Sequence, residues 1–315
     1  MRVIVFGGAG FLGSFVADAL ADAGHEVVIF DRSPSPYRRP EQREIVGDIL
    51  DEAAVAHAVE GCDVVYNYAA IADIGDANES PLETIRVNVL GNTILLEASR
   101  CAGVKRFVFA STLYVYSRAG AFYRSGKQAC ELIIDDYHRA FGLPYTILRY
   151  GSLYGPRATR ANGIHRILTQ ALAEGRIVRE GDGEEMREYI HVWDAAQSSV
   201  DILASEFENA NIIVTGQQPV RVKDLLTMVR EILGGRIAVE YVTPGAEAAA
   251  PSLHYHMTPY SFQPTIARKL VRTSYLDLGQ GLLGLIAGMY QSQHDLRDGN
   301  DVLLADGAHR GSART

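Results

Sequence analysis

Short apolar runs alternate with longer amphipathic segments along the first half of the chain. Each run has four or five residues, mainly Val, Ile, Phe and Tyr, which is typical of strands buried on both faces of a sheet. The segments between them carry apolar residues at the three- and four-residue spacing of helices. The pattern predicts strands at 3–6, 26–30, 64–67, 106–110 and 145–148, and helices at 12–23, 52–59, 81–102 and 123–141. This alternation predicts an α/β fold with a doubly wound parallel sheet.

The helix predicted at 81–102 has the clearest end signals. Ser80 can be its N-cap, Pro81 occupies the first helical position, and Glu83 completes a capping box. Gly103 follows its last residue. In the second half the pattern is looser, with helices expected at 164–173, after a capping Asp194, and at 222–233, and strands at 212–214 and 237–241.

Composition and charge exclude several classes of protein. The 315 residues are 47% hydrophobic and 22% charged, which is enough apolar surface for a core and excludes a disordered chain. The net charge of −8 argues against nucleic acid as a partner. Cys62, Cys101 and Cys130 have no metal-ligand spacing and cannot all pair within one chain, so we expect reduced thiols and no metal site.

No segment of the chain is expected to enter a membrane or direct export. The first apolar run begins at residue 3 and leads directly into glycines rather than into a signal-peptide cleavage site. A later apolar stretch, 281–290, is ten residues long with three glycines and is too short to span a bilayer. A cytoplasmic location is therefore expected.

A glycine-rich loop follows the first predicted strand and opens the first predicted helix. Gly7, Gly10 and Gly13 permit a tight turn and a close backbone approach to a pyrophosphate. Phe11 and Leu12 begin the helix, whose free N–H groups can face the anion. An ordinary strand-to-helix turn is the alternative, but the flanking strand and helix favour a dinucleotide loop.

Two acidic residues follow the next strands. Asp31 ends the second strand 18 residues after Gly13, where a carboxylate can accept hydrogen bonds from ribose hydroxyls and repel a 2′-phosphate. This favours NAD, although Arg32 could pair with a 2′-phosphate and leaves NADP as an alternative. Asp48, followed by Ile49, could reach the adenine amino group, or could instead be a helix N-cap.

Tyr123 and Lys127 form the candidate proton-transfer pair. Their four-residue spacing puts both side chains on one face of a helix. A tyrosine is a poor base at neutral pH, and an adjacent ammonium can lower its pKa by stabilising the phenolate. An amphipathic surface pair is the alternative, but Thr112 follows the preceding strand at the carboxyl edge of the sheet, where ligands bind.

Together these residues resemble a known family over about residues 1–290. The chain resembles the extended short-chain dehydrogenases/reductases, in the branch of NAD-dependent nucleotide-sugar epimerases and dehydratases. The motifs that carry this resemblance, in order, are GGAGFLG (7–13), GDIL (47–50), NYAA (67–70), NVLGNTILLEA (88–98), ASTLYVYS (110–117), YRSGK (123–127), LRYGSLYGPR (148–157) and REYIHVWDAA (187–196).

The resemblance implies roles for individual residues. It makes Thr112 the active-site hydroxyl that binds substrate, Tyr123 the acid/base and Lys127 its partner, the last two also touching the cofactor. It places Ala69 and Asn88 near NAD. The remaining expected substrate contacts are Tyr150, which also faces the nicotinamide, Ser152 and Arg187, which grips the diphosphate of a nucleotide-diphosphate sugar.

Some of these assignments have alternatives. Arg187 could be a surface arginine paired with Glu184, Glu185 or Glu188. His254 lies in an aromatic segment, 251–262, that could stack a base and bind phosphate or could only pack the second lobe.

The resemblance also implies a domain arrangement. A Rossmann-type domain is expected at 1–155, with 189–215 returning to it. A smaller α/β substrate-binding lobe is expected at 156–188 and 216–292, and a disordered tail at 293–315. A homodimer is implied through the helices at 81–102 and 123–141.

The chain departs from the family pattern near the proton-transfer pair. Only ten residues separate Thr112 from Tyr123, which is shorter than usual and predicts a more open or differently shaped sugar pocket. No Thr-Asp-Glu triplet follows the strand, which argues against a 4,6-dehydratase. The favoured activity is a nucleotide-sugar 4-epimerase. A 4-dehydrogenase, reductase or decarboxylase is the alternative, and a non-catalytic NAD sensor is a remote one.

Overall fold

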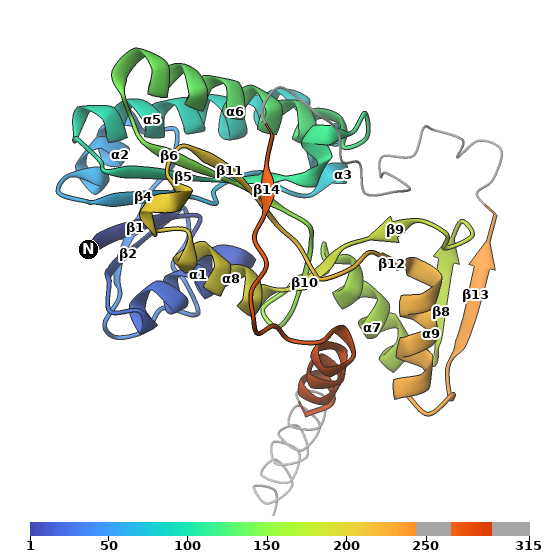
Figure 1. Ribbon diagram of the computed structural model, residues 1–315. Coiled ribbons are helices and arrows are strands. Elements are labelled where there is room, and N and C mark those ends of the chain that lie inside the picture. Colours follow the sequence, from blue (N-terminus) through green and yellow to red (C-terminus); the bar gives the residue numbers. More distant parts are fainter. Residues whose placement is uncertain (244–265, 292–315) are drawn as a thin grey trace, which may run out of the picture.

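The computed structural model describes residues 1–243 and 266–291, and an eight-stranded sheet forms its centre (Figure 1). The strand order is β14-β11-β6-β5-β4-β1-β2-β3, and every neighbouring pair is parallel. These strands are β1 (Arg2–Phe6), β2 (Glu26–Asp31), β3 (Arg43–Val46), β4 (Val64–Asn67), β5 (Arg106–Thr112), β6 (Tyr145–Tyr150), β11 (Ala210–Val214) and β14 (Arg268–Lys269).

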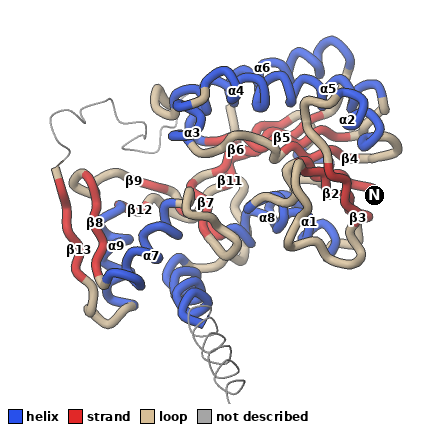
Figure 2. The backbone as a smooth tube through the Cα atoms, turned by 180° about the vertical axis from the view of Figure 1, so that it is seen from behind, coloured by secondary structure: helices blue, strands red, loops and turns tan. Residues whose placement is uncertain are grey.

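Helices cover both faces of this sheet (Figures 1 and 2). One face packs against α1 (Phe11–Asp22) and α8 (Val192–Asp201). The other packs against α2 (Glu52–Val59), α5 (Gly91–Cys101) and α6 (Ala121–Phe141). Each face buries its own apolar cluster, because strands covered on both sides need apolar residues on both sides. The predicted doubly wound parallel sheet is confirmed.

A smaller lobe carries a third apolar core. Its helices are α7 (Gly163–Glu174), α9 (Val222–Ile232) and a helix over 278–291. Its strand pairs are β8 (Arg176–Glu180) with β13 (Ala238–Val242) and β9 (Met186–Arg187) with β12 (Val220–Arg221). A further pair, β7 (Ser152–Tyr154) with β10 (Tyr189–His191), joins the two parts, because Ile190 packs in the core of the sheet domain and Tyr154 in that of the lobe. The range 216–292 was expected wholly in this lobe, but β14 instead pairs with β11 at the edge of the large sheet.

The segment predicted as one helix at 81–102 is three consecutive pieces. These are α4 (Pro81–Ile85), the π-helical turn η1 (Arg86–Leu90) and α5, and the unpredicted α3 (Ile74–Glu79) precedes them. The Ser80 side chain makes no capping hydrogen bond, so the predicted capping box is wrong. Ser80 instead closes α3, with its N–H donating to the Asp76 carbonyl.

Asp194 does not cap α8, contrary to the prediction. The helix begins two residues earlier, and Nδ1 of His191 accepts the Trp193 N–H as the N-cap. The Asp194 carboxylate accepts the N–H of Leu276 at 2.8 Å, so it ties the segment before the last helix to the sheet domain. His254 with its segment 251–262 and the tail at 293–315 lie outside the described residues.

The helix over 278–291 contacts β7 most closely at Gly281. A Cβ atom there would lie 2.3 Å from the hydroxyl of Tyr154, which is 1% exposed. We expect Gly281→Ala to lower the free energy of unfolding by about 1 to 3 kcal/mol, because the core must move to admit a methyl group. The control is Gly284→Ala at an exposed position with no atom within 4 Å of the added Cβ, and it should stabilise by up to about 1 kcal/mol. Urea denaturation measures both changes, and equal effects would contradict this packing.

Candidate functional site

The sheet topology creates a crevice at its carboxyl edge. The chain runs outward from β1 through β2 to β3 and then returns to β4 on the other side of β1. The loops that follow β1 and β4 therefore diverge, and ligands bind at such a switch point in open α/β sheets. A cavity of about 390 Å³ lies there, and a second cavity of about 370 Å³ lies between the sheet domain and the lobe.

The loop after β1 has no room for side chains at two positions. Gly7 has a φ of +77°, and a Cβ on it would lie 2.5 Å from the backbone nitrogen of Ala69. A Cβ on Gly13 would lie 2.1 Å from the Gly7 carbonyl oxygen. The glycines therefore let the first turn of α1 and the loop after β4 pack directly on this turn.

The start of α1 presents free backbone donors. Gly10 is its N-cap and supplies no side-chain acceptor, which leaves the first-turn N–H groups of Phe11, Leu12 and Gly13 without helical partners. The Asp31 carboxylate at the end of β2 accepts the Ala9 N–H at 3.0 Å. The acid and the glycine loop thus form one wall of the first cavity, with a positive helix end beside it.

Half of the predicted cofactor residues line this first cavity. They are Gly7, Gly10, Asp31, Arg32, Asp48, Ile49 and Ala69. Asp48 does not cap the following helix, because Asp51 caps α2 and Asp48 instead accepts the Leu50 N–H. Sequence reasoning missed Ile71 and Tyr68 in the lining, although both follow β4 at the switch point and that position was the available signal.

Asn88 acts on this cavity through the backbone of Ile71. It is 3% exposed and lies in the π-helical turn η1, a feature frequent at functional sites. Its side-chain oxygen accepts the Ile71 N–H at 2.8 Å, and its side-chain nitrogen donates to the Ile71 carbonyl at 3.0 Å. The Asn88 carbonyl accepts a hydrogen bond from the Cys130 thiol on α6. Asn88 therefore fixes a wall residue of the cavity from behind.

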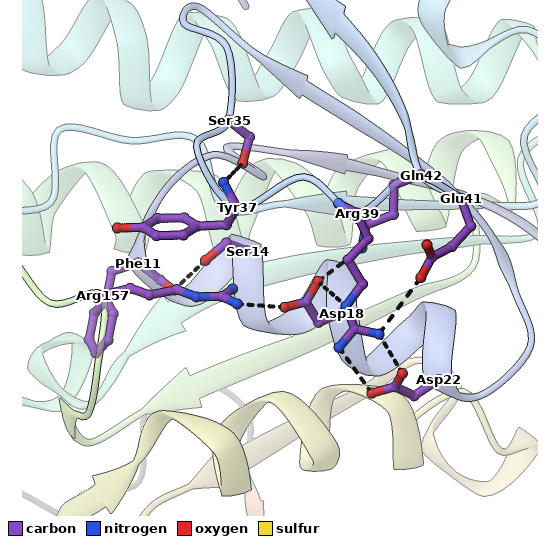
Figure 3. A network of polar contacts seen from close by, with 10 residues as sticks. All are labelled: Phe11, Ser14, Asp18, Asp22, Ser35, Tyr37, Arg39, Glu41, Gln42 and Arg157. Carbon is purple, nitrogen blue, oxygen red and sulfur yellow. Dashed lines mark hydrogen bonds and ion pairs between the residues drawn. The ribbon is translucent and has the colours of Figure 1, made fainter. Parts of the chain in front are cut away.

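A polar network fixes the loop after β2 to α1 (Figure 3). Arg157, just after β7, donates to the Asp18 carboxylate on α1 at 2.8 Å. Its guanidinium lies 4.3 Å from the ring centre of Phe15 and 4.5 Å from that of Tyr37. Gln42 also donates to Asp18, at 3.1 Å. The first residues of the lobe are thereby held against the helix and loop that frame the first cavity.

The structure brings Thr112 and Tyr123 together. Thr112 ends β5, and the short 3-10 helix η2 (Leu113–Tyr116) then leads toward α6, which begins at Ala121. Thr112 is 6% exposed, and its side chain faces the phenol of Tyr123 closely enough to lower the pKa of that phenol. The ring of Tyr114 on η2 contacts the Tyr123 ring edge-on at 6.5 Å between centres.

Lys127 lies one turn further along α6 and is buried. Its Nζ donates to the Ala110 carbonyl at 2.6 Å and lies 4.6 Å from the ring centre of Phe109. It is 5.8 Å from the ring centre of Tyr123. Burial disfavours the ammonium and lowers the pKa of Lys127 to about 8, against the opposing effect of Glu131.

The expected low pKa of Tyr123 is wrong for the protein alone. Burial disfavours the phenolate and raises the pKa of Tyr123 to about 12, although the neighbouring Thr112 hydroxyl acts in the opposite direction. The Lys127 ammonium does not overcome this burial, and it donates to the Ala110 carbonyl. Tyr123 is therefore protonated at neutral pH.

The second cavity reaches Tyr114, the neighbour of the Tyr123 ring, but Thr112, Tyr123 and Lys127 do not line it. Ser152 and Arg187, both predicted to bind substrate, line it together with the unpredicted Asp73, Tyr114, Arg166 and Arg179. Of the acids that could pair with Arg187, Glu185 pairs with Arg179 and Glu184 pairs with Lys223. No motif in the sequence signalled Arg166 or Arg179, because their approach depends on how the lobe packs against the sheet domain.

Tyr150 has a different environment from the one expected. It is 5% exposed, and its hydroxyl is hydrogen-bonded to those of Tyr68 and Ser199. Ser199 belongs to α8, so the Tyr150 hydroxyl points into the core beneath the sheet rather than toward Tyr123. The remaining predicted substrate residue, His254, lies outside the described residues.

The described part of the chain has neither a membrane-spanning helix nor a metal-ligand cluster. Within residues 1–243 and 266–291, none of the helices is long and apolar enough to cross a membrane. The same ranges contain no group of three or more His, Cys, Asp or Glu side chains that could hold a metal ion.

Known proteins resemble this chain in sequence and in fold. The chain is 30% identical over 272 residues to a UDP-glucose 4-epimerase from Corynebacterium glutamicum, a match that covers 76% of this chain and 83% of the relative. It is 31% identical over 247 residues to a UDP-N-acetyl-alpha-D-glucosaminuronate decarboxylase from Bacillus cytotoxicus, covering 69% of this chain and 75% of the relative.

A solved structure agrees with these sequence matches. MoeE5 in complex with UDP-glucose and NAD superposes with a TM-score of 0.77 at 25% identity, covering 93% of this chain and 100% of that one. The sequence model described as the NAD dependent epimerase/dehydratase family matches residues 3–216. The resemblance noted from the motifs is thus confirmed, including NAD as the cofactor of the family. This chain belongs to the NAD dependent epimerase/dehydratase family.

Proposed function

We propose that the protein is a nucleotide-sugar 4-epimerase that holds NAD in the first cavity and the sugar in the second. The observation that carries this proposal is that Tyr123 on α6 faces Thr112 at the end of β5, and that its ring contacts Tyr114, which lines the substrate cavity. A protein that only senses NAD needs the glycine loop but has no use for a buried phenol, hydroxyl and ammonium in one place.

The residues of the first cavity fit a dinucleotide. The glycine turn excludes side chains, the start of α1 offers N–H donors, and the Asp31 carboxylate disfavours a 2′-phosphate, which supports NAD over NADP. Asn88 would act through Ile71. The residues proposed to hold the cofactor directly are Gly7, Gly10, Phe11, Leu12, Gly13, Asp31, Arg32, Asp48, Ile49, Ala69, Tyr123 and Lys127.

The proposed chemistry leaves no net oxidation. NAD, held by the residues of the first cavity, would supply a reversible hydride acceptor for C4 of the sugar. Tyr123 takes the proton of the 4-hydroxyl as the ketone forms, and gives it back when the hydroxyl is restored. Thr112 hydrogen-bonds the same oxygen. Because the pKa of Tyr123 is about 12 in the protein alone, proton loss from Tyr123 depends on cationic charge in the assembled site.

The second cavity suits a diphosphate and a sugar. Arg187 provides a forked, permanently charged donor for the diphosphate, and Ser152 provides a hydroxyl in the same wall. We therefore propose a nucleotide-diphosphate sugar as the substrate.

A decarboxylase of the same family is the second candidate activity. The relative from Bacillus cytotoxicus, 31% identical, bears that name, and the opening oxidation at C4 would be the same. The sugar that is turned over, and release of CO₂, would distinguish the two activities.

We propose a homodimer formed through α4, α5 and α6. Exposed apolar side chains gather there, including Leu82 at 76%, Leu132 at 56% and Phe122 at 41% exposed. Isolated exposed apolar residues are ordinary, but several on adjoining helices indicate a surface that a partner covers.

The cytoplasm is the proposed location, in keeping with three free cysteines.

The activity is tested by incubating the protein, with and without NAD, with UDP-, GDP-, CDP- and dTDP-sugars. We expect NMR to detect a 4-epimer, with no increase in the absorbance at 340 nm that NADH would cause. Tyr123→Phe should reduce turnover at least about 100-fold, because the proton acceptor is lost, while NAD binding is retained. The control is Tyr37→Phe, which keeps the ring beside Arg157. Net NADH, CO₂ release or full activity of Tyr123→Phe would each contradict the proposal.

Burial of Lys127 predicts a dependence of stability on pH. Its folded pKa, about 8, lies below the unfolded value of 10.5, so the cost of burying its charge is present below pH 8 and disappears as pH rises toward 10.5. Wild type should therefore gain about 1 kcal/mol over Lys127→Met between pH 7 and pH 9. Urea denaturation at both values measures this gain. For the exposed control Lys105→Met, the free energy of unfolding should change between the two pH values as much as it does for wild type. The same change for Lys127→Met as for wild type would contradict burial of the charge.

The dimer is tested by adding a charge to its proposed interface. Leu132→Glu should convert the dimer to a monomer in size-exclusion chromatography with light scattering, because the interface would have to bury a carboxylate. Leu283→Glu is a matched control, since Leu283 is 49% exposed on the helix over 278–291. A monomeric wild type, or a dimeric Leu132→Glu, would refute this interface.

A further inference from the structure

A buried carboxylate lies on the same helix face as the proton-transfer pair. Tyr123, Lys127 and Glu131 recur every four residues along α6, so their side chains share one side of the helix. Glu131 touches neither of the two cavities, and no motif in the sequence singled it out. Its contacts nevertheless reach the end of β5, next to Thr112, and through Arg149 the segment that precedes α6.

Glu131 accepts hydrogen bonds from two neighbouring strands. One of its carboxylate oxygens accepts from the Ser111 hydroxyl at 2.5 Å and from Nε of Arg149 at 3.0 Å. The other accepts from Nη2 of Arg149 at 2.6 Å. Ser111 on β5 and Arg149 on β6 are paired in register, so both side chains converge on this carboxylate from adjacent strands.

The network continues to the loop that precedes α6. Nη1 of Arg149 donates to the Tyr116 hydroxyl at 2.5 Å, and its guanidinium lies 4.8 Å from the centre of the Tyr116 ring. Tyr116 ends η2, which also carries the cavity residue Tyr114. Ser111 is the immediate neighbour of Thr112. The single carboxylate thus connects α6, the end of β5 and η2.

Burial of this ion pair makes the loss of either partner costly. The side chain of Arg149 is 1% exposed and that of Glu131 is 11% exposed. A buried ion pair adds little net stability, because desolvation of both charges offsets their attraction, but removal of either partner strands the other charge. A bidentate guanidinium–carboxylate pair also accepts only a narrow range of orientations. The pair is therefore suited to fixing the rotation of α6 against the sheet.

We propose that Glu131 and Arg149 are positioning residues that set the rotation of α6 and so aim Tyr123 and Lys127 at the substrate. This inference rests on the proposed function. The Glu131–Arg149 pair also holds the short connection between Thr112 and Tyr123 in place, because Tyr116 in that connection is hydrogen-bonded to Arg149. Neither residue touches the substrate in this account.

The test compares two charge-neutralising changes on α6. Glu131→Gln keeps the size of the side chain but loses the bidentate pair, and we expect kcat for the nucleotide sugar to fall at least about tenfold, since small misplacements of a reacting group are costly. KM and the Kd for NAD should change less than twofold. The matched control is Asp135→Asn, which removes an acid on the same helix whose partner, Arg139, is 72% exposed. Its kcat should equal that of wild type.

A second readout does not depend on activity. Lys127 is faced by Tyr123, Cys130 and Glu131 from α6 and by the Ala110 carbonyl and the Phe109 ring from β5. Glu131 raises the pKa of Lys127, so in Glu131→Gln the titration of Lys127 should move to lower pH. NMR of labelled lysines can follow this movement, because the chain has four lysines and Lys127→Met assigns the signal.

Ser111→Ala covers the case in which Glu131→Gln does not fold. It removes one hydrogen bond to Glu131 and leaves the ion pair, so kcat should fall about threefold or more without a loss of thermal stability that explains it. A folded Glu131→Gln with wild-type kcat, or an unchanged kcat in Ser111→Ala, would overturn the inference alone. A wild type that turns over no nucleotide sugar would refute the proposed function and this inference with it.

Discussion

Parallel pairing is the constraint on which this site depends. Eight strands that all run in one direction present all their carboxyl ends at one edge, so the loops after β1, β2, β4, β5 and β6 meet there whatever their sequence distance. The order of the strands then separates the loops after β1 and β4 and opens a crevice between them. At the base of this crevice, Gly7 after β1 lets the backbone of Ala69 after β4 approach with no side chain between them. The acidic wall, the hydroxyl of β5 and the helix that follows it all inherit their positions from this geometry.

Burial sets the electrostatics of the proton-transfer pair. Removal from water favours the neutral form of both groups, so the pKa of Tyr123 rises to about 12 while that of Lys127 falls to about 8. The two shifts act against the proton transfer that the pair is proposed to perform. Tyr123 therefore stays protonated until additional positive charge enters the site. Without ligands, proton loss from Tyr123 is limited. The negative charge of the nearby Glu131 carboxylate stabilises the Lys127 ammonium and so raises the pKa of Lys127, against the effect of burial.

Two polar networks hold the sheet domain in shape around the cavities. Asp18 binds Arg157 and Gln42 and thus joins α1, the loop after β2 and the first residues of the lobe (Figure 3). Glu131 and Arg149 join α6 to β5 and β6 on the opposite face. Both networks contain an arginine–carboxylate ion pair, Arg157 with Asp18 and Arg149 with Glu131, and such pairs restrict orientation more than apolar packing does. Each cavity is therefore framed by side chains that do not line it.

Features that depend on local chemistry could be predicted from the chain alone. Apolar runs located the strands of the sheet, and the glycines of the first loop predicted its tight turn, because both depend on residues adjacent in the chain. The tertiary structure decided what depends on distant contacts. It turned the Tyr150 hydroxyl toward Ser199, placed Asn88 behind Ile71, and added β14 to the sheet from the far end of the chain. It also raised the pKa of Tyr123, because spacing along a helix specifies a neighbour but only packing specifies how much water remains.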